Sequence, residues 1–153
     1  MLRKAEYYTN CGSGVLGRAL SVLYRYRLRR LGKKLGGFCI SPNCFGPGLS
    51  IAHFGPIVVH PNAVIGKNCR IHECVTIGAT NGSTSAAKIG DNVFLASGAK
   101  IIGDIEIAND VAVGANAVVV KDILKPGITV GGVPAKQISE NNSHSNLSEM
   151  LEL

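Results

Sequence analysis

Aliphatic residues return every six positions along the second half of the chain. The series consists of Val59, Ile65, Ile71 and Ile77 and then, after one gap, of Ile89, Leu95, Ile101, Ile107, Val113 and Val119. Small or β-branched residues precede its members by two positions: Ala63, Cys69, Val75, Val93, Ala99, Ile105, Val111 and Ala117. Two apolar positions in six fit neither the period of an α-helix nor the alternation of a simple strand. The pattern therefore predicts a repeat of one short strand and one corner.

The corners of this repeat carry residues that tolerate a positive φ angle. Glycine often follows the aliphatic position, as at Gly66, and Asn or Asp comes soon after in the pairs Lys67-Asn68, Asp91-Asn92 and Asn109-Asp110. Three hexapeptides make a triangular coil of about eighteen residues, and stacked coils align their aliphatic side chains. We therefore predict a parallel β-helix, an all-β fold whose hand the repeat alone leaves open.

The six-residue register is interrupted at two places. No aliphatic residue stands at position 83, and the surrounding residues are polar, so we expect Ala79 to Ala87 to leave the coil as an extruded loop. A slip of two residues lies between Ile51 and Val59, around His53-Phe54-Gly55-Pro56. Irregular places in a regular scaffold often carry function, so both breaks are candidate sites.

The chain divides into three predicted segments. Residues 1–36 form a basic helical cap, residues 37–138 the coiled domain and residues 139–153 a C-terminal tail. An amphipathic helix is expected over residues 15–35, with an apolar face that covers the open first coil. The leucines on or near that face are Leu16, Leu20, Leu23, Leu28, Leu31 and Leu35. The tail is expected to be partly disordered, unless a short docking helix forms from Leu147, Met150, Leu151 and Leu153.

The positive charge is concentrated in the first segment. The formal net charge is +6, and residues 1–36 hold nine Lys or Arg against the single Glu6. A basic helix of this kind is more often a solvated face, and weak association with an anionic membrane surface is the second interpretation. Nucleic-acid binding is not expected, because neither an aromatic platform nor a binding motif accompanies the charge.

The cysteines and the hydropathy pattern limit the class of protein. The five cysteines form no CxxC pair and no Cys/His ligand spacing, so neither a disulfide framework nor a metal site is expected. No apolar run approaches the ~20 residues of a membrane span, and the N-terminus lacks the features of a signal peptide. We therefore expect a cytoplasmic protein with reduced thiols and no metal.

The hexapeptide pattern and the segment Ser50-Ile51-Ala52-His53-Phe54-Gly55-Pro56-Ile57-Val58-Val59 resemble those of the hexapeptide-repeat acyltransferases. The similarity runs from about Gly37 to Lys136, and it is to serine acetyltransferases and to their relatives in surface-polysaccharide gene clusters. This resemblance implies a left-handed coil and acetyl-CoA as the donor. It also implies that His53 is the general base that activates an acceptor hydroxyl.

A histidine suits this role because its ordinary pKa lies near neutrality, so its neutral form can accept a proton. The plainer alternative is that His53 only fills a corner of the coil. His60 and His72 lack a comparable context and are expected at exposed corners. His72, next to Glu73, is the second candidate, as part of the lining of an acceptor pocket.

The same resemblance implies which residues contact acetyl-CoA. In this family the cofactor lies in a groove between subunits of a homotrimer and is recognised mainly by backbone groups beside small residues. The matching positions are Ser97, Ala115, Val120, Lys121 and Lys136. Gly78 and Ala79 open the extruded loop, where their backbone amides are placed to contact the thioester or the pantetheine arm. The two lysines are expected to meet the phosphates of the cofactor, since a lysine is a compact point charge. The alternative is that the small residues only let coils stack and that the lysines are solvated.

Two departures from the serine acetyltransferase pattern bear on the acceptor. Those enzymes carry an Asp where this chain has Cys39, and a second histidine where this chain has Ala86-Ala87-Lys88. We therefore expect the acceptor to be a sugar hydroxyl of a surface-polysaccharide precursor, with L-serine as the alternative. An inactive trimeric scaffold is a further alternative. A zinc-dependent γ-type carbonic anhydrase would need an H-x-x-x-x-H pair, which the four histidines do not form.

Overall fold

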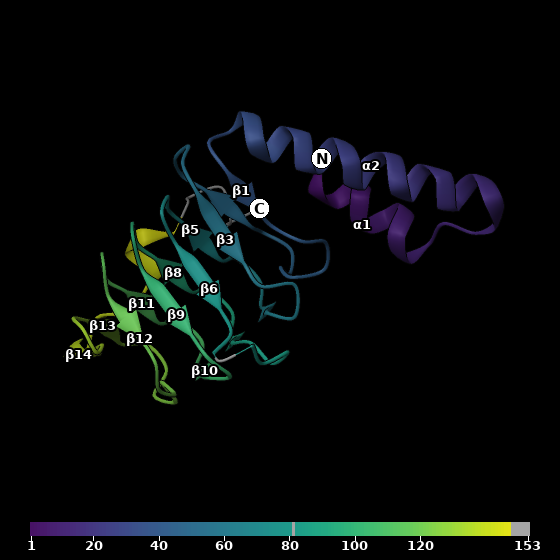
Figure 1. Ribbon diagram of the computed structural model, residues 1–153. Helices are drawn as coiled ribbons and strands as arrows, with labels where there is room; N and C mark the ends of the chain where they lie inside the picture. Colours follow the sequence, from purple (N-terminus) through teal and green to yellow (C-terminus); the bar gives the residue numbers. More distant parts are fainter. Residues whose placement is uncertain (81, 148–153) are drawn as a thin grey trace.

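The computed structural model describes residues 1–80 and 82–147, which form two N-terminal helices followed by a stack of short strands (Figure 1). The helices are α1 (Leu2–Asn10) and α2 (Gly14–Lys34). The strands are β1 (Phe38–Cys39), β2 (Ser50–Ile51), β3 (Ile57–Val59), β4 (Val64–Ile65), β5 (Arg70–Ile71), β6 (Thr76–Gly78), β7 (Lys88–Ile89), β8 (Phe94–Leu95), β9 (Lys100–Ile102), β10 (Glu106–Ile107), β11 (Ala112–Val113), β12 (Val118–Val119), β13 (Thr129–Gly131) and β14 (Lys136–Ser139). A 3-10 helix, η1, spans His144–Asn146.

The strands form three sheets that the chain visits in turn. The first sheet has the order β1-β3-β6-β9-β12, the second β4-β7-β10, and the third β2-β5-β8-β11-β13, with β14 antiparallel at its end. Figure 1 shows the strands of the first sheet side by side along one face. In a regular coil each residue pairs with the residue eighteen positions later, as Lys88 pairs with Glu106. The predicted stack of three-sided parallel coils is confirmed.

The predicted aliphatic column is the core of this stack. Every residue of the two repeat series is buried, with an exposed fraction of 9% or less. Ile101 pairs in register with Ile77 on one side and with Val119 on the other, so equivalent side chains lie over one another in successive coils. Removing an aliphatic side chain of this size from water stabilises the fold by about 1.5–3 kcal/mol.

The corner residues adopt the backbone that their types predict. Asn68, Asn92 and Asp110 have φ angles of 56°, 56° and 62°. Their side chains form a ladder, in which Asn68 Nδ2 donates to Asn92 Oδ1 at 3.0 Å and Asn92 Nδ2 donates to Asp110 Oδ1 at 2.9 Å. Gly66 is needed for another reason, because a Cβ atom there would lie 2.7 Å from the backbone carbonyl of Gly90.

The extruded loop is shorter than the sequence predicted. Val64 pairs with Lys88, twenty-four residues later, so this coil holds only six residues more than a regular one. The predicted loop included Ala86 and Ala87, but these residues are buried in the core, with exposed fractions of 4% and 0%. Ala87 stands two positions before Ile89, which is the place of the small residue in the repeat. Apolar packing therefore returns the chain to the coil before the predicted end of the loop.

The N-terminal segment contains two helices, where the sequence predicted one. The helix expected over residues 15–35 corresponds to α2, and the nine-residue helix α1 was not predicted. Contacts made after folding hold α1 in place. The rings of Tyr8 and Tyr24 stack at 4.9 Å between the two helices. Glu6 Oε1 accepts a hydrogen bond from the backbone amide of Asn43 at 2.9 Å, which ties α1 to the first coil.

The cap over the first coil is only partial. Figure 1 shows both helices extending outward from one end of the stack. In α2, Leu16 and Leu23 are 73% and 42% exposed, whereas Leu28 and Leu31 near the coil, and Leu35 directly after the helix, are half-buried. The prediction of one continuous apolar face on the coil is therefore wrong for the first half of α2. Among the described residues, neither helix combines the length and the apolarity that crossing a membrane requires.

The first part of the C-terminal tail is docked against the coil. Ser143 is buried and its hydroxyl donates to the backbone carbonyl of Asn92, and His144 Nε2 lies 2.7 Å from Asp110 Oδ1. Residues 143 and 144 are therefore held against the coil, and the expected partial disorder of the tail stays a prediction for its remaining residues. Of the residues proposed for a docking helix, Met150, Leu151 and Leu153 lie outside the described residues.

Acid should weaken the docking of this tail. The hydrogen bond with His144 and, to a smaller degree, that from Asn92 lower the pKa of the Asp110 carboxyl below its ordinary value of 3.8. A carboxyl whose pKa is lowered by folding stabilises the folded state fully above its unfolded pKa, and this contribution is lost as the pH falls through the lower folded value. We expect the difference in unfolding free energy between the wild type and Asp110→Asn to stay constant above about pH 5 and to shrink as the pH falls below about 4. Urea unfolding at each pH measures it, and a difference that does not change with pH would contradict a role for the charge.

Candidate active site

The first irregular corner of the coil carries His53. Ile51 pairs with Ile71, twenty residues later, whereas Val58 pairs with Thr76, only eighteen residues later. Two additional residues therefore lie between β2 and β3, which confirms the predicted slip. His53 is exposed at this corner.

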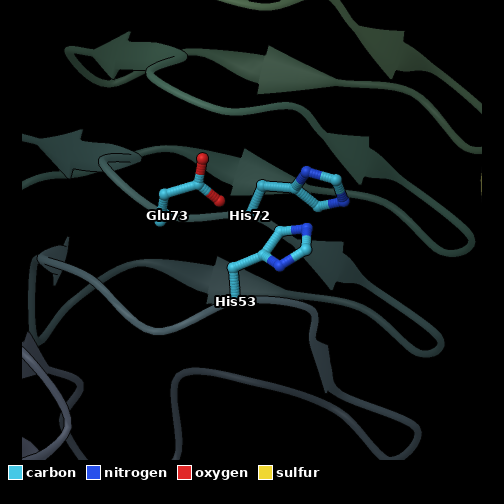
Figure 2. Close-up of side chains that lie close together, drawn as sticks. All are labelled: His53, His72 and Glu73. Carbon is cyan, nitrogen blue, oxygen red and sulfur yellow. The ribbon is translucent and has the colours of Figure 1, made fainter.

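Two side chains of the next coil lie beside His53. His72 and Glu73 follow β5, and Figure 2 shows the two imidazole rings and the carboxylate grouped together. One ring nitrogen from each histidine and one carboxylate oxygen of Glu73 all lie within 4.8 Å of one another. The rings of His53 and His72 meet edge to face, with centroids 5.1 Å apart, and His72 meets Phe94 in the same way at 5.0 Å. The fold thus gathers three titratable side chains from two successive coils.

The carboxylate of Glu73 is held by a hydroxyl from the following coil. Ser97 Oγ donates to Glu73 Oε1 at 2.5 Å. This hydrogen bond is the main cause that lowers the pKa of Glu73 below its ordinary value of 4.5, and the backbone amide of Glu73 contributes further. The second oxygen, Oε2, is buried and has no hydrogen-bond partner within residues 1–80 and 82–147. Glu73 therefore carries a negative charge with one unsatisfied oxygen near the histidines.

Partial burial lowers the pKa of His72 below its ordinary value of 6.5. The charge of His53 lowers this pKa further, Glu73 raises it, and Arg70 makes a smaller lowering contribution. His72 is therefore mainly neutral at pH 7. A neutral imidazole has one nitrogen that donates a hydrogen bond and one that accepts.

The residues predicted to contact acetyl-CoA fall at separate places. Two of them, Ser97 and Ala115, lie at the same corner of the triangular coil as His53, since each follows a strand of the third sheet. Four others lie at the next corner, where the strands of the first sheet end: Gly78, Ala79, Val120 and Lys121. Lys136 begins β14 and is exposed. A single chain therefore does not bring all of these residues together.

The sequence did not identify Glu73 as part of the site. Glu73 and Ser97 are twenty-four residues apart, which is not a multiple of the regular coil. They reach the same corner because the extruded loop adds six residues between them. The sequence therefore shows that Glu73 and Ser97 share a corner only when the length of that loop is known.

Comparison with known proteins identifies the repeat. Residues 86–121 match the family of bacterial transferase hexapeptides, described as six repeats. The serine acetyltransferase of Buchnera aphidicola is 40% identical over 106 residues, which cover 67% of this chain and 40% of that protein. The serine acetyltransferase of Mycobacterium tuberculosis is 32% identical over 142 residues, which cover 91% of this chain and 58% of that protein. This chain is a serine acetyltransferase-like hexapeptide-repeat protein.

Solved structures agree with this assignment of the serine acetyltransferase-like chain. A serine acetyltransferase from Brucella abortus in complex with coenzyme A superposes with a TM-score of 0.75 and 28% identity, over 92% of this chain and 54% of that one. A serine acetyltransferase from Neisseria gonorrhoeae in complex with serine gives a TM-score of 0.66 and 37% identity, over 75% of this chain and 47% of that one. The serine acetyltransferase-like chain thus spans about half the length of these solved proteins.

Proposed function

We propose that this chain transfers the acetyl group of acetyl-CoA to a hydroxyl group of a small-molecule acceptor, with His53 as the general base. The observation that carries the proposal is the exposed His53 at the irregular corner of a serine acetyltransferase-like coil. The related structure solved with coenzyme A supports acetyl-CoA as the donor. The same neighbours support a left-handed coil.

The reaction needs only one proton relay. A ring nitrogen of His53 accepts the hydroxyl proton while the acceptor oxygen attacks the carbonyl carbon of the thioester. The carbon–sulfur bond then breaks, and the leaving thiolate takes the proton back from His53. Backbone amides near Gly78 and Ala79 are the proposed donors to the oxyanion. No metal is required for any of these steps.

The separation of the predicted cofactor residues supports a homotrimer with a site between neighbouring chains. The groups around His53 and around Gly78 lie at opposite ends of the strands of the first sheet, so a second copy is the simplest way to complete a groove. Exposed apolar side chains lie along this surface: Phe54 at 78%, Val58 at 43% and Val120 at 44%. Their burial against another chain would be favourable. A cytoplasmic location and a weak membrane association of α2 stay predictions.

L-serine is the acceptor that the comparisons favour, because the relatives are serine acetyltransferases and one of them is solved with serine. The sugar hydroxyl stays as the second candidate because of one structural observation. Of Ala86-Ala87-Lys88, which stand where those enzymes carry a second histidine, the two alanines are buried in the core and Lys88 is exposed. No side chain from the two alanine positions can therefore contact an acceptor in the same way.

The proposal is tested by the release of free CoA thiol from acetyl-CoA. The wild-type chain is assayed with L-serine, nucleotide sugars and simple hexosides, and acetyl-CoA binding is measured separately by calorimetry. Release that depends on one acceptor supports the transferase and identifies the acceptor class. Absence of both release and acetyl-CoA binding would reject the proposal in favour of an inactive scaffold.

Glu73 is the proposed positioning residue for His53, in place of the aspartate of serine acetyltransferases. Cys39, at that sequence position, is exposed on β1, whereas the Glu73 carboxylate lies within 4.8 Å of the histidine nitrogens. We expect Glu73→Gln to lower kcat by roughly tenfold, about 1.4 kcal/mol of barrier, and to leave the KM for acetyl-CoA unchanged.

The matched control for Glu73 is Cys39→Ser. If Glu73 has taken over the orienting role, Cys39→Ser keeps the wild-type kcat. A larger loss of kcat in Cys39→Ser than in Glu73→Gln would assign the role to Cys39.

A further inference from the structure

We infer that His53, His72 and Glu73 form a binding site for a divalent transition-metal ion of the Zn²⁺ class. The site needs no other residue of this chain, and its existence does not depend on the transferase activity. Its effect on catalysis, described below, rests on the proposed function.

The ligand atoms are already grouped. One nitrogen from each histidine and one oxygen of Glu73 lie within 4.8 Å of one another. Ligands of a tetrahedral Zn²⁺ ion, bound at ~2.0–2.2 Å, lie about 3.3–3.6 Å apart. A change of roughly 1 Å therefore brings the three atoms into contact with one ion. The exposed side chain of His53 is free to make most of that movement.

The chemistry of the three ligands suits zinc. Two imidazoles and one carboxylate are a recurrent zinc ligand set, which leaves a fourth position open to water or a small molecule. Hard ions such as Mg²⁺ and Ca²⁺ prefer sites made of oxygen alone, so this set favours a transition metal.

The unsatisfied oxygen of Glu73 points to a missing partner. Oε2 is buried without a hydrogen bond among the described residues. A buried carboxylate oxygen without a partner is costly, and a bound cation would satisfy it. The other oxygen, Oε1, accepts a hydrogen bond from Ser97 Oγ at 2.5 Å. Outer hydrogen bonds of this kind orient the ligands of metal sites.

The backbone fixes the two coils relative to each other. The amide of Ala52, next to His53, donates to the carbonyl of Ile71 at 3.1 Å, and the amide of His72 donates to the carbonyl of Leu95 at 3.0 Å. Both histidines thus stand next to residues held in the parallel ladder of the third sheet. The site therefore requires no rearrangement of the coil.

Metal binding would block the proposed chemistry. A nitrogen lone pair of His53 that binds Zn²⁺ is no longer available to accept the acceptor proton. We expect added Zn²⁺ to inhibit acetyl transfer reversibly and EDTA to restore it.

Binding is tested by calorimetric titration with ZnCl₂. The three exposed thiols, Cys11, Cys39 and Cys74, are replaced by serine in the background chain so that they do not bind the ion. We expect one Zn²⁺ per chain. His72→Ala and Glu73→Gln should each weaken binding by roughly 100-fold or more, since even outer-shell changes cost ~10–100-fold. His60→Ala, which removes a histidine outside the cluster, should leave it unchanged.

A second readout does not depend on activity. In ¹H–¹⁵N spectra of the histidine rings, Zn²⁺ should shift the resonances of His53 and His72 and leave those of His60 and His144 in place. Absence of one-to-one binding, or full affinity in both His72→Ala and Glu73→Gln, would overturn the inference. If the metal-free chain shows no acetyl transfer with any acceptor, the proposed function fails while these binding tests still decide the metal site.

Discussion

We expect His53→Ala to lower kcat for acetyl transfer by a factor of roughly 10²–10⁴, the usual contribution of general-base catalysis. His53 is exposed at the corner where two additional residues push the chain out of the regular coil. The substitution removes the group that accepts the hydroxyl proton and leaves the core untouched. CoA release with the acceptor found for the wild type measures the effect.

The matched control is His144→Ala, which removes a histidine of the C-terminal tail, away from the His53 corner. His144 lies 2.7 Å from Asp110, on the docked tail. This variant should keep the wild-type kcat. An equal loss of activity in both variants would show that histidine substitutions act through folding, and full activity in His53→Ala would exclude His53 as the base.

Ile101→Ala is expected to lower the free energy of unfolding by about 2–5 kcal/mol. Ile101 is 0% exposed and lies in β9, between Ile77 of β6 and Val119 of β12. The truncated side chain loses its own burial and leaves a cavity in the middle of the column, where the rigid ladders on both sides restrict collapse. Urea unfolding at one fixed protein concentration measures the change.

The control for the core prediction is the same substitution on the surface. Ile138 lies in β14 and is 66% exposed, so Ile138→Ala should change the unfolding free energy by less than about 0.5 kcal/mol. Similar losses in both variants would mean that stability does not depend on the aliphatic column.

The repeating part of the fold was predictable because its signal is local. Each coil buries the same two positions in six, and the hexapeptides from Val59 to Val119 carry apolar residues at both positions except in the extruded loop around position 83. The Asn and Asp corners followed from the same logic, since Asn68, Asn92 and Asp110 have the positive φ angles expected of their residue types. Repetition let many weak signals reinforce one another.

The errors occurred where the repeat gives no guidance. Helix α1 is only nine residues long, and contacts such as that of Glu6 with Asn43 can hold it only after the first coil has formed. Ala86 and Ala87 are compatible with either a loop or a core, and in the folded chain they are packed in the core. The docking of the first part of the tail depends on the contact of Ser143 with Asn92, two residues that are fifty-one positions apart.

The sequence by itself determined the coil, the position of its irregular corner and the histidine at that corner. It did so because periodicity and its interruption are properties of neighbouring residues. Only the tertiary structure decided which side chains join His53, since Glu73 and Ser97 meet through the pairing of separate coils and the length of the loop between them. The contact between Glu73 and Ser97 also determines the environment of the negative charge in the site. The hydroxyl of Ser97 holds one oxygen of Glu73, and burial leaves the other without a partner near two imidazoles.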